Sequence, residues 1–109
     1  MTYDAKLKEA LEALGLHVEA GLDTSAGPEY CVYGYDSSGT LFGDDGPCLE
    51  YRRWTVVYVA PVGQNRLAMR QNIRRAIFEV FGVWPSEEPA PDAYGQRYLY
   101  DFETVGGLL

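Results

Sequence analysis

The stretch Cys48–Gly63, CLEYRRWTVVYVAPVG, contains the longest predicted strand of this chain. Its first half alternates loosely between polar and apolar residues, whereas its second half, Trp54–Ala60, is apolar or β-branched on both sides of the chain. A strand needs cover on each face that carries apolar side chains. Here one face holds Trp54, Val56, Tyr58 and Ala60, and the other holds Thr55, Val57 and Val59.

The segment before this strand predicts an amphipathic helix and a hairpin. Thr2 can cap the helix, and Gly15 can end it in a left-handed conformation. Its buried side is expected to hold Tyr3, Leu7, Ala10, Leu11 and Leu14. Residues 16–22 alternate in polarity, as in a short edge strand or an extended connection.

Two strands are expected to form the hairpin. The segment Glu29–Tyr35 is rich in aromatic and β-branched residues, which favour strands. Asp36–Pro47 is expected to be a long polar loop with ragged strand extensions, and Cys48–Ala60 is the longer second strand.

The C-terminal half predicts a helix and one more strand. Gln64–Phe81 is the longest helical pattern, and Gly82 can stop it. Val83–Gln96 is Pro-rich and is expected to be a loop. Arg97–Val105 alternates cleanly, as a half-buried strand does. The buried side of the helix is expected to consist of Leu67, Met69, Ile73, Ala76, Ile77, Val80 and Phe81.

These elements predict one α+β domain over residues 1–109. The expected order is helix, possible strand, two-stranded hairpin, helix, strand. The economical arrangement is a single antiparallel sheet of three to four strands with both helices packed on one face. The other face of such a sheet is left without helices.

Charge and composition limit the classes of function that are compatible with this chain. The formal net charge is −7, and the segment 64–82 carries four Arg against one Glu, so the rest of the chain carries −10. An acidic chain is repelled by phosphate backbones, which disfavours nucleic-acid binding as the main role. No signal peptide and no run of 18 apolar residues is evident, so we expect a cytoplasmic protein with no membrane segment.

The second face of the central strand is a candidate contact surface. If the helices cover one face, Thr55, Val57 and Val59 form an apolar or β-branched stripe on the other, and such a stripe often marks a contact site. The alternative is that a loop, or the tail at Leu108 and Leu109, covers this stripe within the same chain.

Charged residues supply further interface candidates. Arg66, Arg70 and Arg74 are spaced i, i+4 and i+8, and like charges at this spacing are mildly destabilising unless acidic groups lie nearby. Those groups can belong to the same chain or to a neighbour, or the stripe is simply solvated. Asp44 and Asp45 lie in an acidic loop that is either solvated or faces a partner, because it lacks the register of a calcium loop.

No pattern in the sequence favours catalysis or a bound metal. His17 has no Cys or Ser partner nearby, and its polar register predicts a surface position. Cys31 and Cys48 lie on the two arms of the hairpin, and in a cytoplasm we expect them to be reduced. Two Cys and one His are too few for a zinc site. We therefore expect no enzyme activity and no cofactor.

The layout resembles that of the small tail-terminator, or tail-completion, proteins of long-tailed bacteriophages and prophages. The resemblance covers most of the chain and rests on the order of elements. It is carried by LGLHVEAGL (14–22), PEYCVYGY (28–35), the loop with DDG (44–46), YRRWTVVYV (51–59) and RYLYDFE (97–103).

The resemblance implies an antiparallel sheet flanked by helices and a six-membered homo-oligomeric ring in the tail or neck of a virion. Such a ring caps the tail tube, stops its polymerisation and docks head-side connector proteins. It is assembled in the host bacterial cytoplasm, and DNA is only passing cargo. The family has no catalytic residues to carry over.

Three other interpretations remain open from the sequence. The first is a different phage neck, head-closure or minor virion protein, which differs only in its partner. The second is a monomeric binding module that takes a peptide or a small ligand. The third is a small enzyme that uses carboxylates or His17.

Overall fold

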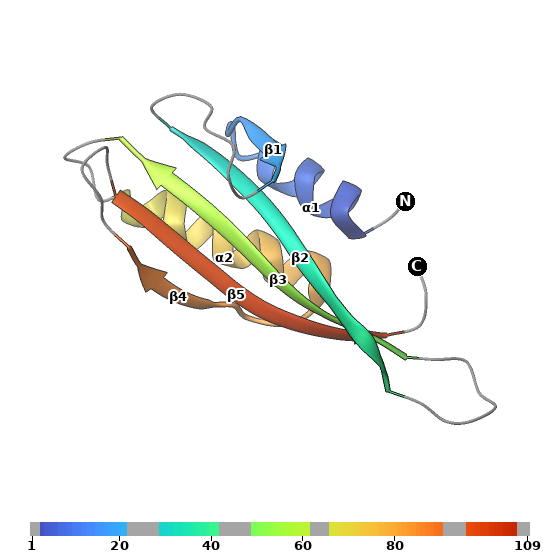
Figure 1. Ribbon diagram of the computed structural model, residues 1–109. Coiled ribbons are helices and arrows are strands. Elements are labelled where there is room, and N and C mark those ends of the chain that lie inside the picture. Colours follow the sequence, from blue (N-terminus) through green and yellow to red (C-terminus); the bar gives the residue numbers. More distant parts are fainter. Residues whose placement is uncertain (1–2, 22–28, 42–48, 62–65, 91–95, 107–109) are drawn as a thin grey trace.

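The computed structural model describes residues 3–21, 29–41, 49–61, 66–90 and 96–106 of the chain. Two helices and five strands follow one another along it (Figure 1). They are α1 (Tyr3–Glu12), β1 (Val18–Ala20), β2 (Tyr30–Leu41), β3 (Leu49–Ala60), α2 (Leu67–Phe81), β4 (Ser86–Pro89) and β5 (Gln96–Gly106).

The strands form one sheet in the order β1-β2-β3-β5-β4. β1 runs parallel to β2, and every other neighbouring pair is antiparallel. The α+β class, the two helices and the single sheet are therefore confirmed. The expected three to four strands and the purely antiparallel arrangement are wrong.

In the parallel pair, β1 and β2 begin at the same end of the sheet. Val18 lies opposite Cys31, and Ala20 lies opposite Tyr33. The backbone N–H of Cys31 donates to the carbonyl of His17 over 2.9 Å. The alternation of residues 16–22 marks an edge strand correctly, but alternation carries no information on strand direction.

Strand β4 lies inside the segment that we expected to be a loop. Its sequence, Ser86-Glu87-Glu88-Pro89, is polar and ends in proline, so it has no apolar strand pattern. It forms as an outer strand beside β5, where Ser86 lies opposite Asp101 and Pro89 opposite Tyr98. An edge position tolerates proline and polar residues because only one side of the strand must be hydrogen-bonded.

Strand β2 continues into the segment that was predicted as a loop with ragged strand extensions. The residues from Asp36 to Leu41 continue the strand, with Asp36 opposite Arg53 and Leu41 opposite Leu49 after an irregularity in the register. The expected ragged strand extensions are therefore confirmed up to Leu41, while the rest of the predicted loop, residues 42–48, lies outside the described part. In Figure 1, β2 and β3 project beyond α2 at this end.

Glycine ends both helices as expected. Gly15 and Gly82 have φ of 89° and 76°, in the left-handed region that favours glycine. The N–H of Gly82 donates to the carbonyl of Phe78 over 2.7 Å. Thr2, the expected cap of α1, lies outside the described residues. Leu67, expected on the buried side of α2, is 54 % exposed, so that assignment is wrong.

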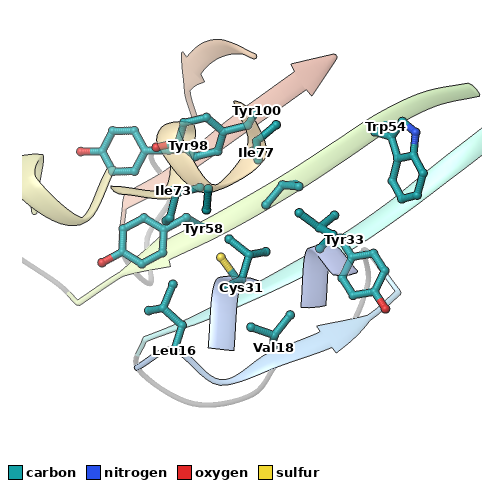
Figure 2. Close-up of a cluster of buried hydrophobic side chains, with 14 of the residues drawn as sticks. Leu16, Val18, Cys31, Tyr33, Trp54, Tyr58, Ile73, Ile77, Tyr98 and Tyr100 are labelled. Atoms are coloured by element: carbon teal, nitrogen blue, oxygen red, sulfur yellow. The ribbon is translucent and has the colours of Figure 1, made fainter. Parts of the chain in front are cut away.

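Both helices pack on the same face of the sheet, as expected. Leu7 and Leu11 of α1 and Ile73 and Ile77 of α2 are fully buried. They join one cluster with strand residues of the same face, several of which Figure 2 shows. These strand residues are Val18, Cys31, Tyr33, Trp54, Val56, Tyr58, Ala60, Tyr98, Tyr100 and Phe102.

Trp54 anchors one end of this cluster. Its ring lies 5.0 Å from that of Phe81 and 6.0 Å from that of Phe102, measured between centroids. Its indole Nε1 donates to Thr104 Oγ1 over 3.1 Å. The side chain is therefore buried with its one polar group hydrogen-bonded.

The opposite face of the sheet, here called the second face, carries a smaller cluster. It consists of Tyr30, Val32, Val57 and Val59, with Leu99 packed against it. The expected division of the central strand into two apolar faces is confirmed.

The two tryptophans give a matched test of this fold. Trp54→Ala is expected to lower the free energy of unfolding by about 3–5 kcal/mol, because it leaves a cavity in the main cluster. Trp84→Ala is expected to cost less than about 1 kcal/mol, because Trp84 is 56 % exposed. Urea denaturation followed by circular dichroism measures both. Equal losses for the two variants would contradict the placement of Trp54.

Candidate interaction surface

Arg66, the first residue of the predicted arginine stripe, is paired within the chain. It directly precedes α2 and has a left-handed backbone with φ of 52°. Its Nε lies 3.1 Å from Glu29 Oε2. The Tyr58 hydroxyl donates to the same carboxylate oxygen. Burial raises the pKa of Tyr58 to about 12, and this hydrogen bond is the second largest cause.

Arg70, the second residue of the stripe, joins α2 to β4. Its Nη2 lies 2.6 Å from Glu87 Oε1, and its Nε donates to Glu87 Oε2 over 3.2 Å. The Tyr100 hydroxyl donates to Glu87 Oε2 over 2.7 Å. The guanidinium also lies 4.1 Å from the ring centre of Tyr98. The hydrogen bonds from Arg70 lower the pKa of Glu87, and burial raises that of Tyr100.

The third residue, Arg74, belongs to a different environment. Its guanidinium lies 6.0 Å from the ring centre of Trp84, and its Nε is buried without a hydrogen-bond partner in the described part of the chain. Trp84 stacks on Phe78 with 4.7 Å between ring centroids and 14° between planes. The two rings are 56 % and 39 % exposed.

We call Arg74, Arg75, Phe78 and Trp84 the aromatic–basic patch. A hollow of about 380 Å³ lies there, lined by Gln71, Arg74, Arg75 and Trp84. Within the described residues, neither Arg74 nor Arg75 forms an ion pair. Exposed Trp beside Arg is the composition that dominates binding energy in protein interfaces. The patch can therefore anchor a protein partner.

The predicted apolar interface residues lie on the second face. Val57 and Val59 are only 8 % and 7 % exposed in the isolated chain. Their burial accounts for their apolar character without a partner. Thr55 is half-buried, and its hydroxyl donates to Asp101 Oδ1 over 3.0 Å. A contact role for these three residues stays a prediction, and Asp44 and Asp45 lie outside the described residues.

Helix α2 and the second face of the sheet differ in charge. Helix α2 contains three Arg and one Glu. On the second face, the strand register places more acidic than basic side chains. The acidic residues are Glu19, Asp36, Glu88, Asp101 and Glu103, and the basic ones are Arg53 and Arg97.

The other residues considered for catalysis or metal binding do not form a common site among the described residues. His17 is exposed, as predicted, with its Nε2 3.1 Å from Glu19 Oε1. Cys31 is buried opposite Tyr58, and burial raises the pKa of its thiol. Cys48 lies outside the described residues. Across the residues that the structure describes, no three His, Cys, Asp or Glu side chains group as metal ligands, and no helix could cross a membrane.

The two aromatic residues of the patch, Phe78 and Trp84, were not predicted from the sequence. Phe78 could have been identified from the sequence as a candidate contact residue, because it is a large aromatic residue that falls outside the predicted buried side of α2. The sequence did not indicate that Trp84 is exposed, since an aromatic residue in a Pro-rich segment can equally be buried or exposed. The Arg74 position was predicted, but its aromatic neighbours were not.

In comparisons with known proteins, no protein-family model and no curated protein matches this chain.

Glu87 and Glu88 are adjacent and make a matched pair of variants. Glu87→Gln removes the carboxylate that joins Arg70 to Tyr100, and it is expected to cost about 1.5–3 kcal/mol of unfolding free energy at pH 7. Glu88→Gln is the control, because Glu88 is exposed, and it is expected to have little effect.

The cost of Glu87→Gln should depend on pH. The folded pKa of Glu87 is below its ordinary value, so its contribution is fully present above the unfolded pKa of about 4.3 and is lost as pH falls through the folded pKa. Urea denaturation between pH 7 and pH 2 measures this. A difference between wild type and variant that grows as pH falls would contradict the assignment.

Proposed function

We propose that this protein is a structural assembly protein that forms a ring of about six copies, as a phage tail terminator does. In that role the ring caps the tail tube and presents a docking surface to head-side connector proteins. It would work in the tail or neck of a virion, without catalysis or a cofactor. DNA would pass it only as cargo.

The aromatic–basic patch is the observation that carries this proposal. Trp84 and Phe78 expose large ring surfaces that are hydrophobic, and Arg74 lies beside them. Large aromatic residues and Arg that lie together at the surface are enriched at the anchor points of protein interfaces. The charge of the molecule favours a protein partner over nucleic acid, because the chain carries −7 overall.

The order of elements also supports the proposal. The sheet with both helices on one face agrees with the fold that the resemblance implies. The parallel strand β1 departs from a purely antiparallel sheet, but it adds only three residues at one edge. The long strands β2 and β3 continue past α2, so this end of the sheet can reach a neighbouring subunit (Figure 1).

A monomeric binding module is the second candidate. It is favoured by the hollow beside Trp84, which is large enough to hold part of a peptide. The two functions differ in one measurable property, since a module of this kind stays monomeric at all concentrations.

The decisive measurement is the solution mass by light scattering after size exclusion, over a wide range of protein concentration. The proposal expects a species of about six times the 12.2 kDa chain mass, appearing as ring-shaped particles by negative-stain electron microscopy. Strictly monomeric protein at every concentration would contradict self-assembly and favour the binding module.

A further inference from the structure

The charges around the aromatic–basic patch favour a partner surface that is acidic. Arg66 and Arg70 have Glu29 and Glu87 in their own chain, whereas Arg74 and Arg75 have no such pair within the described residues. Arg75 is exposed and its positive charge is available for an intermolecular contact, whereas Arg74 is half-buried and also helps to lower the pKa of Glu87. Their neighbours Phe78 and Trp84 supply apolar area at the same place.

The same chain carries an acidic surface on the other side of its sheet. Asp36, Glu88 and Glu103 are exposed, and the register places all three on the second face. Arg53 lies between Asp36 and Glu103 in the sheet and offsets part of their charge. With Glu19, Asp101 and Arg97 included, the described part of this face has five acidic and two basic residues, an excess of three negative charges.

The patch and the acidic residues cannot meet within one molecule, because the sheet separates them. Between copies they can meet, since the helix side of one subunit can face the second face of the next. Such a contact is heterologous, with different surfaces on the two sides, and repeated contacts of this kind form a closed ring or an open filament. Complementary charge would set the orientation of the two copies.

We propose that the aromatic–basic patch is the docking site for the next copy of this chain, which it contacts through Asp36, Glu88 and Glu103 of the second face. Trp84 and Phe78 form the anchor of the contact, and Arg74 and Arg75 pair with the carboxylates. The proposal rests on the self-assembly proposed above and names the two surfaces that produce it.

The first test removes one side of the contact. Trp84→Ala and the double variant Arg74→Glu with Arg75→Glu are expected to weaken association at least tenfold while the fold is kept. The matched control is Lys6→Glu with Lys8→Glu, which makes the same change of charge on exposed residues of α1 and should leave the mass of the assembly unchanged. Circular dichroism confirms that each variant is folded.

The second test restores the contact by exchanging charges. Glu88→Arg with Glu103→Arg reverses the acidic side and is expected to weaken association when this variant is alone. An equimolar mixture with the Arg74→Glu, Arg75→Glu variant should assemble again. When the two variants alternate, the acidic patch of one faces the basic second face of the other, and the basic patch of the other faces the acidic second face of the first. Higher salt should weaken the wild-type assembly, since screening acts on exposed charges.

The outcomes separate the two proposals. If the wild type assembles and the patch variants assemble equally well, the copies meet elsewhere and this inference is wrong, although the proposed self-assembly stands. If the mixture fails to assemble while each double variant is folded, the second face is not the partner surface. A wild type that is monomeric throughout would overturn both proposals.

Discussion

Strand β3 is the element on which the rest of the structure depends, because it is apolar on both faces at the centre of the sheet. Its neighbours β2 and β5 hydrogen-bond to it along nearly its whole length. The helices cover the face with Trp54 and Tyr58, and side chains of β2 and β5 surround Val57 on the other. Burial of both faces removes apolar surface from water, which is the dominant favourable contribution to folding.

The outer parts of the sheet are held in a different way. β4 has no apolar strand pattern, but Glu87 accepts hydrogen bonds from both Arg70 of α2 and Tyr100 of β5. The carboxylate thus ties the edge strand to the helix layer and to the sheet at once. A charged group that is mostly removed from water needs such partners, since an unpaired one would oppose folding. The arginines of α2 and its start therefore differ: Arg66 and Arg70 form ion pairs within the subunit, whereas the half-buried Arg74 and the exposed Arg75 form none among the described residues.

This difference connects the fold to the proposed assembly. The sheet separates a basic, aromatic surface on α2 from a surface on which acidic residues predominate. A molecule with two dissimilar and complementary sides favours contacts that repeat in one direction over two-fold pairing of identical surfaces. Core packing also explains why Trp84 and Phe78 lie outside the core. The apolar side of α2 faces β3 and β5, so Phe78 lies on the other side of the helix, where Trp84 stacks on it.

Residue spacing was enough to predict the α+β class, the two helices, the glycine ends of those helices and the two apolar faces of β3. These features are local, since they follow from residue spacing and from the conformations that glycine permits. The direction of β1 and the presence of β4 came from tertiary contacts, because edge strands depend on backbone pairing with a distant neighbour more than on their own side chains. The partners of Arg66 and Arg70, and the stacking of Trp84 on Phe78, were likewise decided by contacts between separate segments, which residue spacing along one helix does not encode.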